Sequence, residues 1–235
     1  MRPSSYLQRR DQLTTYFDQT AAAAWQALTS NAPVSRVRAT VRAGRDDMRS
    51  TLLDWLPADL TGKTLLDAGC GTGALAVDAA RRGASVIAID VASNLVNVAR
   101  ERAAEEEFSG EIDFRVGDML ADAPAKVDHI VAMDSLIHYA AVDVHKVVAE
   151  FAGRARSSVH FTAAPWTVSL AMMHFVGRQL ARSSSNRAPA IEPVRIGRLM
   201  DHLDASLADE GWVIGRSERI KSGFYISHAL ELIHR

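Results

Sequence analysis

The chain has 235 residues, of which 48% are hydrophobic and 23% charged, the composition of an ordinary globular protein with one large domain. Its 27 basic and 28 acidic residues leave a net charge of −1, so the total charge gives no indication of a nucleic-acid partner. The single cysteine, Cys70, excludes an internal disulfide and suits a reducing compartment. The first residues show no secretory signal, and no apolar run reaches the roughly 20 residues of a membrane span. We therefore expect a cytoplasmic protein, at most peripheral to a membrane.

The first 57 residues form an arm that precedes the motif-bearing part of the chain. In its second half, apolar or small residues recur at steps of three and four, which predicts a helix with one apolar stripe. This stripe consists of Val34, Val37, Val41, Gly44, Met48, Leu52 and Trp55. A parallel stripe consists of Arg38, Arg42, Arg45 and Arg49. The ordinary interpretation of such an arginine stripe is a solvated helix face.

From Leu65 onward, short runs rich in valine and isoleucine alternate with helical patterns, which predicts a parallel sheet with crossover helices. The predicted strands are 63–67, 85–90, 112–116, 127–133 and 158–163. The predicted helices are 74–82, 93–106, 142–151 and 195–210. Two further apolar runs, 212–220 and 224–233, stand close together, which predicts a hairpin and an antiparallel last strand.

A second segment outside a minimal doubly wound domain lies at about 165–193. Its first part is apolar almost all round, with Met172, Met173 and Phe175 among its residues, and so requires burial on more than one side. Its second part, 182–193, contains a Ser-Ser-Ser-Asn run and two prolines, and we expect it to be a loop.

The most specific motif is Asp67-Ala-Gly69-Cys-Gly71-Thr-Gly73, at the predicted turn from a strand into a helix. Glycines there let the backbone approach a ligand closely and open the helix N-terminus toward it. The spacing also satisfies the dinucleotide fingerprint, so the glycines alone do not identify the ligand.

Two carboxylates narrow the choice of ligand. Asp67 disfavours a pyrophosphate, because like charges about 5–6 Å apart at an effective dielectric near 20 repel by on the order of 3 kcal/mol. The same carboxylate attracts an ammonium group. Asp90 ends the next predicted strand, where a carboxylate accepts hydrogen bonds from ribose hydroxyls. Together they favour a nucleoside with a positively charged amino-acid tail, which describes S-adenosylmethionine.

The motifs of residues 60–235 resemble those of the class I S-adenosylmethionine-dependent methyltransferases. Besides the glycines and Asp90, the resemblance rests on Gly117-Asp118-Met119 and Val131-Ala-Met133-Asp134. It implies an α/β fold with a doubly wound, mostly parallel seven-stranded sheet of order 3-2-1-4-5-7-6. It also implies that Asp118 lies near the adenine amino group and Met119 against the ring, with Met133 and Asp134 in the same cofactor site.

A narrower resemblance covers nearly the whole chain. Residues 134–139, 161–165 and 187–193, with parts of the arm, resemble the magnesium-protoporphyrin IX O-methyltransferases of chlorophyll and bacteriochlorophyll synthesis. Relatives often end the arm's tryptophan-containing helix with a tyrosine, whereas this chain has Thr29 at about that place. A catalytic role of that tyrosine is therefore not carried over.

The narrower resemblance implies methylation of one porphyrin propionate, giving a monomethyl ester and S-adenosylhomocysteine. A carboxyl group with a pKa near 4.3 is already ionised at neutral pH, so positioning and desolvation should matter more than a general base. His138 is the candidate to orient this carboxylate or, alternatively, to ligate the porphyrin magnesium. Tyr139 and Tyr16 are the hydroxyl candidates.

The substrate side of the site is expected in the insert. An apolar slot rimmed by cations would suit a flat macrocycle with charged propionates. The candidate residues are Met172, Met173, Phe175, Arg178 and Arg187. Core packing is an equally good interpretation of the methionines. We expect no metal ion bound by the protein itself.

A partner follows from the resemblance, and a movement from the arm. The porphyrin-carrying subunit of magnesium chelatase is the expected transient partner, near a photosynthetic membrane. The arm, 1–57, should act as a lid on the methyltransferase domain, 58–235, because it is amphipathic and precedes the glycine motif at the ligand-facing edge of the sheet.

Three alternatives share part of the pattern. The first is a class I methyltransferase acting on a quinone, a small amine or another carboxylic acid. The second is a module that senses S-adenosylmethionine without catalysis. The third is an NAD-dependent oxidoreductase, which Asp67 disfavours.

Overall fold

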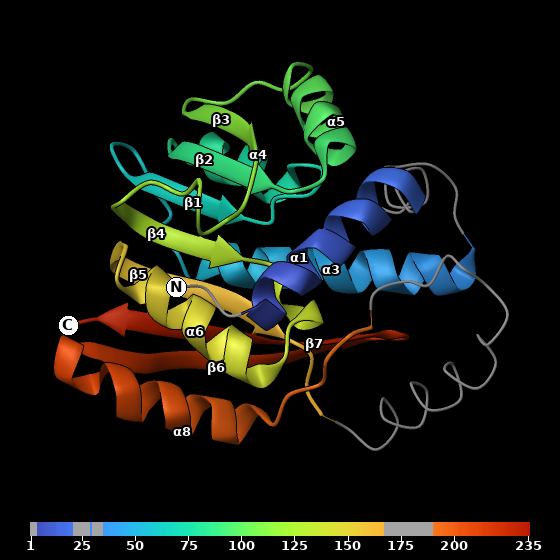
Figure 1. Ribbon diagram of the computed structural model, residues 1–235. Helices are drawn as coiled ribbons and strands as arrows, with labels where there is room; N and C mark the ends of the chain where they lie inside the picture. The colour runs from blue at the N-terminus through green and yellow to red at the C-terminus, as the bar shows by residue number, and fades with distance from the viewer. Residues whose placement is uncertain (1–3, 21–28, 30–34, 167–189) are drawn as a thin grey trace, which may run out of the picture.

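The computed structural model describes residues 4–20, 29, 35–166 and 190–235 (Figure 1). The apolar first part of the insert lies outside these residues. The candidate substrate residues Met172, Met173, Phe175, Arg178 and Arg187 therefore lie outside the described part of the chain.

A seven-stranded sheet of order β3-β2-β1-β4-β5-β7-β6 forms the centre of the molecule. Its strands are β1 Thr64–Ala68, β2 Ser85–Asp90, β3 Glu111–Val116, β4 Val127–Ala132, β5 Ala155–Ala163, β6 Trp212–Ser222 and β7 Tyr225–His234. Strands β1 to β5 pair in parallel, whereas β7 runs antiparallel to both β5 and β6. The predicted sheet order and the predicted terminal hairpin are confirmed.

Four helices follow strands of the sheet where the sequence predicts them: α4 Ala74–Arg81, α5 Ser93–Ala103, α6 Ala141–Ala152 and α8 Ile196–Leu207. Two described helices of the arm precede the sheet: α1 Ser4–Thr15, and α3 Arg36–Asp54, which contains the predicted apolar stripe. Three single-turn elements are the π-helix η1 Tyr16–Thr20 and the 3₁₀ helices η2 Leu136–His138 and η3 Ala208–Glu210. The predicted helices exist, with ends shifted by a few residues, as local signals allow.

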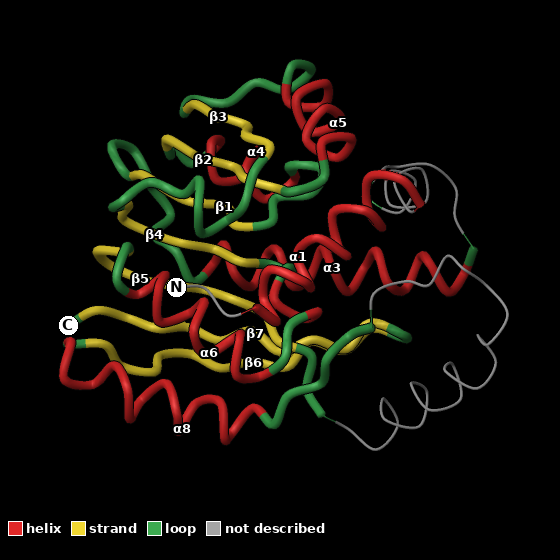
Figure 2. Tube along the Cα trace, viewed as in Figure 1, coloured by secondary structure: helices red, strands yellow, loops and turns green. Residues whose placement is uncertain are grey.

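Two hydrophobic clusters cover the two faces of the sheet. On one face, Phe151 of α6 and Leu203 of α8 are fully buried with Ile130 and Phe161 of the sheet. On the other face, α3 and α4 pack on the sheet, and Met48 of α3 is fully buried in that second cluster. Figure 2 shows the strands between these helices. The two clusters therefore hold the helices on both faces of the sheet, and the carboxyl ends of the strands stay accessible for a ligand site.

From Val41 to Trp55, the apolar stripe predicted for the arm faces the core, whereas Val34 lies outside the described residues. Met48 and Leu52 have no exposed surface. A Cβ atom at Gly44 would lie 2.5 Å from Cδ1 of Tyr225, so only glycine lets α3 approach the start of β7 this closely. Helix α3 is thus part of the folded core.

The first helix takes a different path. Helix α1 crosses the end of the sheet near η2 (Figure 1), and its residues Tyr6 and Leu13 are 1% and 5% exposed. In the described part of the chain, no helix combines the length and the apolar composition that crossing a bilayer requires.

Candidate functional site

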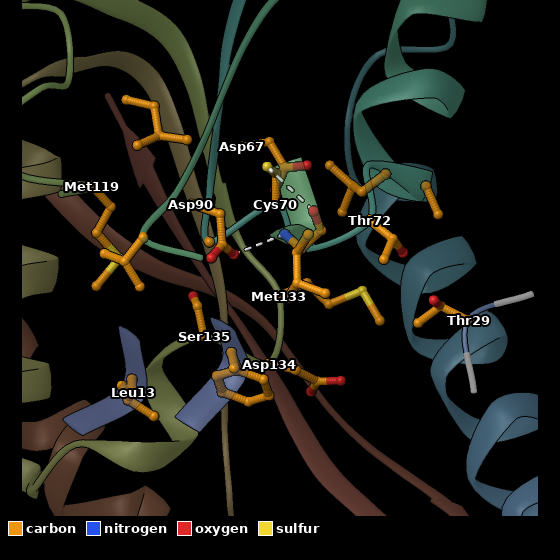
Figure 3. A pocket seen from close by; sticks show the side chains of 18 of the residues that line it. Leu13, Thr29, Asp67, Cys70, Thr72, Asp90, Met119, Met133, Asp134 and Ser135 are labelled. Carbon is orange, nitrogen blue, oxygen red and sulfur yellow. Dashed lines mark hydrogen bonds between the residues drawn. The ribbon is translucent and has the colours of Figure 1, made fainter. Parts of the chain in front are cut away.

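A cavity of about 310 Å³ lies where the carboxyl ends of β1, β2 and β4 meet the arm (Figure 3). Its volume falls in the range of small-molecule sites. Its walls come from the glycine loop, here defined as residues 69–73, from the ends of β2 and β3, from residues 133–139, and from α1, η1 and α3. Of the predicted site residues, Asp67, Gly69, Gly71, Asp90, Met119, Met133, Asp134, His138 and Tyr139 line it.

The glycine loop has the backbone shape that the motif predicts. Gly69, Gly71 and Gly73 have φ angles of 85°, 54° and 81°, a left-handed region that favours glycine. A Cβ atom at Gly69 would lie only 2.4 Å from Cβ of Ser135, so the loop also needs glycine to meet the segment after β4. Gly73 caps the N-terminus of α4.

Asp90 holds the glycine loop from the end of β2. Its Oδ2 accepts a hydrogen bond from the backbone N–H of Gly71 at 2.9 Å, and its Oδ1 accepts one from Ala92 at 2.9 Å. Burial raises the pKa of this carboxyl group, although both backbone hydrogen bonds oppose the shift. The carboxylate therefore fixes the loop and also faces the cavity, where ribose hydroxyls can donate to it.

Asp67 is the more unusual of the two carboxylates. It is 1% exposed, and burial, followed by the nearby charge of Asp90, raises its pKa to about 7. Its Oδ2 atom has no hydrogen-bond partner among the described residues. A buried carboxylate oxygen without a donor is costly, and an ammonium group would remove that cost. The site thus fits the cationic amino-acid end of S-adenosylmethionine.

Ser135 is a cavity residue that the sequence analysis did not single out. Its Oγ atom is buried and has no hydrogen-bond partner in the described part of the chain. It follows β4 directly after Asp134 and lies against Gly69. The sequence around Ser135 gives no signal that it lines the cavity. Its place there arises only because two loops that are distant in the chain approach each other.

Asp118 is placed differently from its neighbours. Gly117 and Met119 line the cavity, whereas the Asp118 carboxylate is turned to α1. It accepts hydrogen bonds from the Tyr6 hydroxyl at 3.3 Å and from Arg10 at 3.0 Å, besides two backbone N–H groups of its own turn. This carboxylate ties the arm to the loop after β3.

His138 and Tyr139 line the cavity at the end of η2 and just after it. The Nδ1 atom of His138 is 3.4 Å from the carbonyl oxygen of Ala190, and burial lowers the pKa of this imidazole. Tyr139 stacks on Tyr6 with ring centroids 5.1 Å apart, and burial raises its pKa well above the usual value. The remaining hydroxyl candidate, Tyr16, packs edge-on against Phe17, and only the latter is among the described cavity residues.

The arginine stripe of α3 is not simply a solvated face. Arg42, Arg45 and Arg49 line the cavity, and only Arg38 is exposed as that interpretation predicts. Arg45 pairs with Asp134, and Arg49 donates from Nε to Asp78 of α4 at 2.8 Å. The interpretation was wrong because the apolar stripe and the sheet edge together turn these arginines to the cavity, which periodicity alone does not show.

Thr29, the residue at which we expected this chain to depart from its relatives, lines the same cavity. Its carbonyl oxygen and its Oγ1 accept hydrogen bonds from Nη1 of Arg102, at 3.0 and 3.2 Å.

The match to known proteins extends over this whole arrangement. Residues 65–157 match the family described as methyltransferase domain, and residues 132–234 match magnesium-protoporphyrin IX methyltransferase C-terminus. The chain is 43% identical to the magnesium-protoporphyrin O-methyltransferase of Rhodobacter capsulatus over 97% of this chain and 98% of that protein. The chain belongs to the magnesium-protoporphyrin O-methyltransferase family.

The fold of this chain is also similar to that of a solved structure. The magnesium protoporphyrin IX methyltransferase of Synechocystis PCC 6803 with bound SAH superposes with a TM-score of 0.83 at 25% identity, over 97% of this chain and all of that one. A ubiquinone biosynthesis O-methyltransferase of Xylella fastidiosa is 32% identical over only 64% of this chain. The interpretations as a non-catalytic sensor and as an oxidoreductase lose their basis, since the members of the family are S-adenosylmethionine-dependent methyltransferases.

The raised pKa of Asp67 predicts a pH dependence of cofactor binding. When the pH is below the Asp67 pKa of about 7, this carboxyl group is protonated in the ligand-free protein. Binding of an ammonium group must then first release that proton. We expect the affinity for S-adenosylmethionine to rise with pH between about 5.5 and 7, by up to tenfold per pH unit, and then to level off. Calorimetric titration with S-adenosylmethionine at several pH values in this range measures the affinity.

The matched control for this prediction is Asp67→Asn, which keeps the shape of the side chain and removes its titration. This variant should bind more weakly and with little dependence on pH over the same range. If the affinity of the unaltered protein for S-adenosylmethionine stays constant from pH 5.5 to 7, the role given to Asp67 is contradicted.

Proposed function

We propose that this chain transfers the methyl group of S-adenosylmethionine to a propionate carboxylate of magnesium protoporphyrin IX, giving the monomethyl ester. The observation that carries the proposal is the 43% identity over 97% of the chain, which includes the arm and the segment after β4 as well as the cofactor motifs. An enzyme that shared only the cofactor motifs would not need to match in those acceptor-side segments.

The chemistry divides between the bound cofactor and the chain. When bound, S-adenosylmethionine supplies an electrophilic sulfonium methyl group to an acceptor oxygen. The acceptor carboxylate is already ionised at neutral pH, so the chain needs no strong base. Asp67, Asp90 and the glycine loop hold the cofactor, while the acceptor loop, here defined as residues 134–139, holds the acceptor. Closure of the cavity around the bound acceptor would remove water from the attacking oxygen.

The surroundings of His138 favour one of its two candidate roles. A carbonyl oxygen only accepts, so the contact of Nδ1 with Ala190 places the proton on Nδ1. Because burial lowers the pKa of the ring, the imidazole is neutral at neutral pH and its Nε2 carries a lone pair. A lone pair does not donate a hydrogen bond to a carboxylate but does ligate a metal ion. We therefore assign His138 to the magnesium of the substrate.

The lid proposal is limited to the first part of the arm, because α3 belongs to the core. Helix α1 and η1 close the cavity through polar contacts with several separate elements. Arg10 binds Asp118, and Arg9 binds Glu192 at 2.7 Å. Asp18 accepts a hydrogen bond from the backbone N–H of Asn94 at 2.9 Å and so caps α5. The contacts of Arg9 and Asp18 lie near the surface, where they can break and re-form as a substrate enters.

Incubation with methyl-labelled S-adenosylmethionine and magnesium protoporphyrin tests the function directly. We expect mass analysis to find one labelled methyl group on the porphyrin, removable by mild alkali as an ester. Quinone and simple carboxylic-acid acceptors serve as controls and should remain unlabelled. Labelling of a quinone, with an unlabelled porphyrin, would replace this proposal by the alternative acceptor class.

The role of His138 predicts a difference between two porphyrins. His138→Ala should weaken binding of magnesium protoporphyrin by about tenfold or more, while metal-free protoporphyrin binds both proteins equally. Titration of the porphyrin Soret band measures these affinities. Affinity for S-adenosylmethionine should stay unchanged, which controls for misfolding. An equal loss for both porphyrins would instead assign His138 to the carboxylate.

Removal of residues 1–30 tests the lid. The truncated protein should keep its affinity for S-adenosylmethionine within about threefold but lose turnover by at least about tenfold, because the acceptor side can no longer close. Equilibrium binding and single-turnover rates separate the two effects. Full turnover by the truncated protein would show that this part of the arm is no lid.

A further inference from the structure

Asp134 stands out in the backbone of the acceptor loop. Its φ angle is 54°, and it is the only described non-glycine residue with a positive φ. Such a conformation is strained for a residue with a Cβ atom and persists only where the surroundings hold it. Asp134 is also 9% exposed, so its carboxylate must find partners inside the protein.

Three elements supply those partners. The Tyr225 hydroxyl at the start of β7 donates to Oδ1 at 3.0 Å, and Arg45 of α3 pairs with Oδ2. In β5, Oγ1 of Thr162 accepts the backbone N–H of Asp134 at 2.7 Å. Burial beside this carboxylate raises the pKa of Tyr225 well above its usual value, so the hydroxyl keeps the proton that it donates.

The packing of α3 fixes the tyrosine ring itself. Gly44 lies against the ring, and a Cβ atom there would lie 2.5 Å from Cδ1 of Tyr225. The next residue of the helix, Arg45, reaches the same carboxylate that the tyrosine hydroxyl binds. Two consecutive residues of α3 thus set both the position of the ring and the charge that faces Asp134.

Asp134 is the first residue of the acceptor loop, residues 134–139. Ser135, which follows directly, lies against Gly69 of the glycine loop. Leu136 is fully buried, and its carbonyl oxygen accepts the N–H of Tyr139 at 3.1 Å. His138 lies between them on the cavity wall. A change in the backbone at Asp134 would therefore move His138 relative to the glycine loop.

We propose that Tyr225, together with Arg45, is a positioning residue that holds Asp134 in its left-handed conformation and thereby places His138 for the acceptor. Asp134 in turn anchors the acceptor loop and is not itself a ligand of the cofactor. The inference rests on the proposed function for the identity of the acceptor, but the loop anchoring stands on the contacts alone.

Tyr225→Phe is the decisive variant, because it removes the hydroxyl and keeps the ring that packs on Gly44. We expect turnover to fall by about tenfold, while affinity for S-adenosylmethionine changes by less than about threefold. Amide hydrogen exchange of residues 135–139 should become faster in the variant. His138→Ala should itself lower turnover, through its weaker binding of magnesium protoporphyrin. In that background Tyr225→Phe should cost little further turnover, because both changes act on one group.

Arg82→Gln is the matched control for a general loosening of α3. Arg82 binds the carbonyl oxygen of Leu53 and, at 3.2 Å, the carboxylate of Asp54, both at the other end of the helix. This variant should lower the melting temperature without changing turnover or exchange in the acceptor loop. If Tyr225→Phe behaves like Arg82→Gln, or if its loss multiplies with that of His138→Ala, the proposal is overturned.

Asp134→Asn keeps the test decisive if Tyr225→Phe fails to fold. Asparagine tolerates a positive φ and still accepts a hydrogen bond from Tyr225, but it removes the charge that Arg45 binds. We expect faster exchange of residues 135–139 here too, with unchanged cofactor affinity. A loss of cofactor affinity would instead make Asp134 a cofactor ligand. Hydrogen exchange is measured without porphyrin, so it tests the loop anchoring alone. Failure of the proposed function would appear in a different experiment, the incubation of the unaltered protein with methyl-labelled S-adenosylmethionine, as a porphyrin that stays unlabelled.

Discussion

An acidic residue stands at or just after the carboxyl end of four neighbouring parallel strands, and each carboxylate needs a partner. Asp118 and Asp134 are buried and are paired by the chain itself, through Arg10 and Arg45. Asp90 is bound by two backbone N–H groups. Asp67 differs, because one of its oxygens has no partner among the described residues. Since uncompensated buried charge is costly, this one site is left for a cationic ligand.

The same electrostatic requirement explains how the arm reaches the domain. Helix α1 brings Tyr6 and Arg10 to Asp118, and α3 brings Arg45 to Asp134, so these two described helices of the arm bind at one cavity. Both helices also bury apolar side chains. Met48 and Leu52 bury α3 in one core cluster, and Tyr6 and Leu13 bury α1 in the other. Helix α1 adds ion pairs through Arg9 and Arg10.

The acceptor proposed above is a carboxylate, which needs no general base, so the chain has to supply position and the exclusion of water. Accordingly, the polar groups on the acceptor side are mostly anchored to other parts of the chain: Tyr139 stacks on Tyr6, and Asp134 is bound from β5, β7 and α3. Rigid anchoring of the loop after β4 keeps the reacting groups close to the glycine loop.

The sequence by itself determined the sheet, its order, the glycine loop and the two carboxylates that identify the cofactor class. The strands follow from alternating periodicities, and the glycine loop and carboxylates from motifs whose residues are neighbours in the chain, whereas the strand order was implied by the resemblance of these motifs to the class I methyltransferases. Only the tertiary structure decided what the arginine stripe does, where Asp118 points, and that Ser135 and Tyr225 belong to the site. The reason is the distance along the chain: Tyr225 is 91 residues from Asp134, and Arg10 is 108 residues from Asp118. Contacts of that kind leave no periodic trace, because they arise only when the packing of α3 and the order of the strands bring the two ends of the chain to one edge of the sheet.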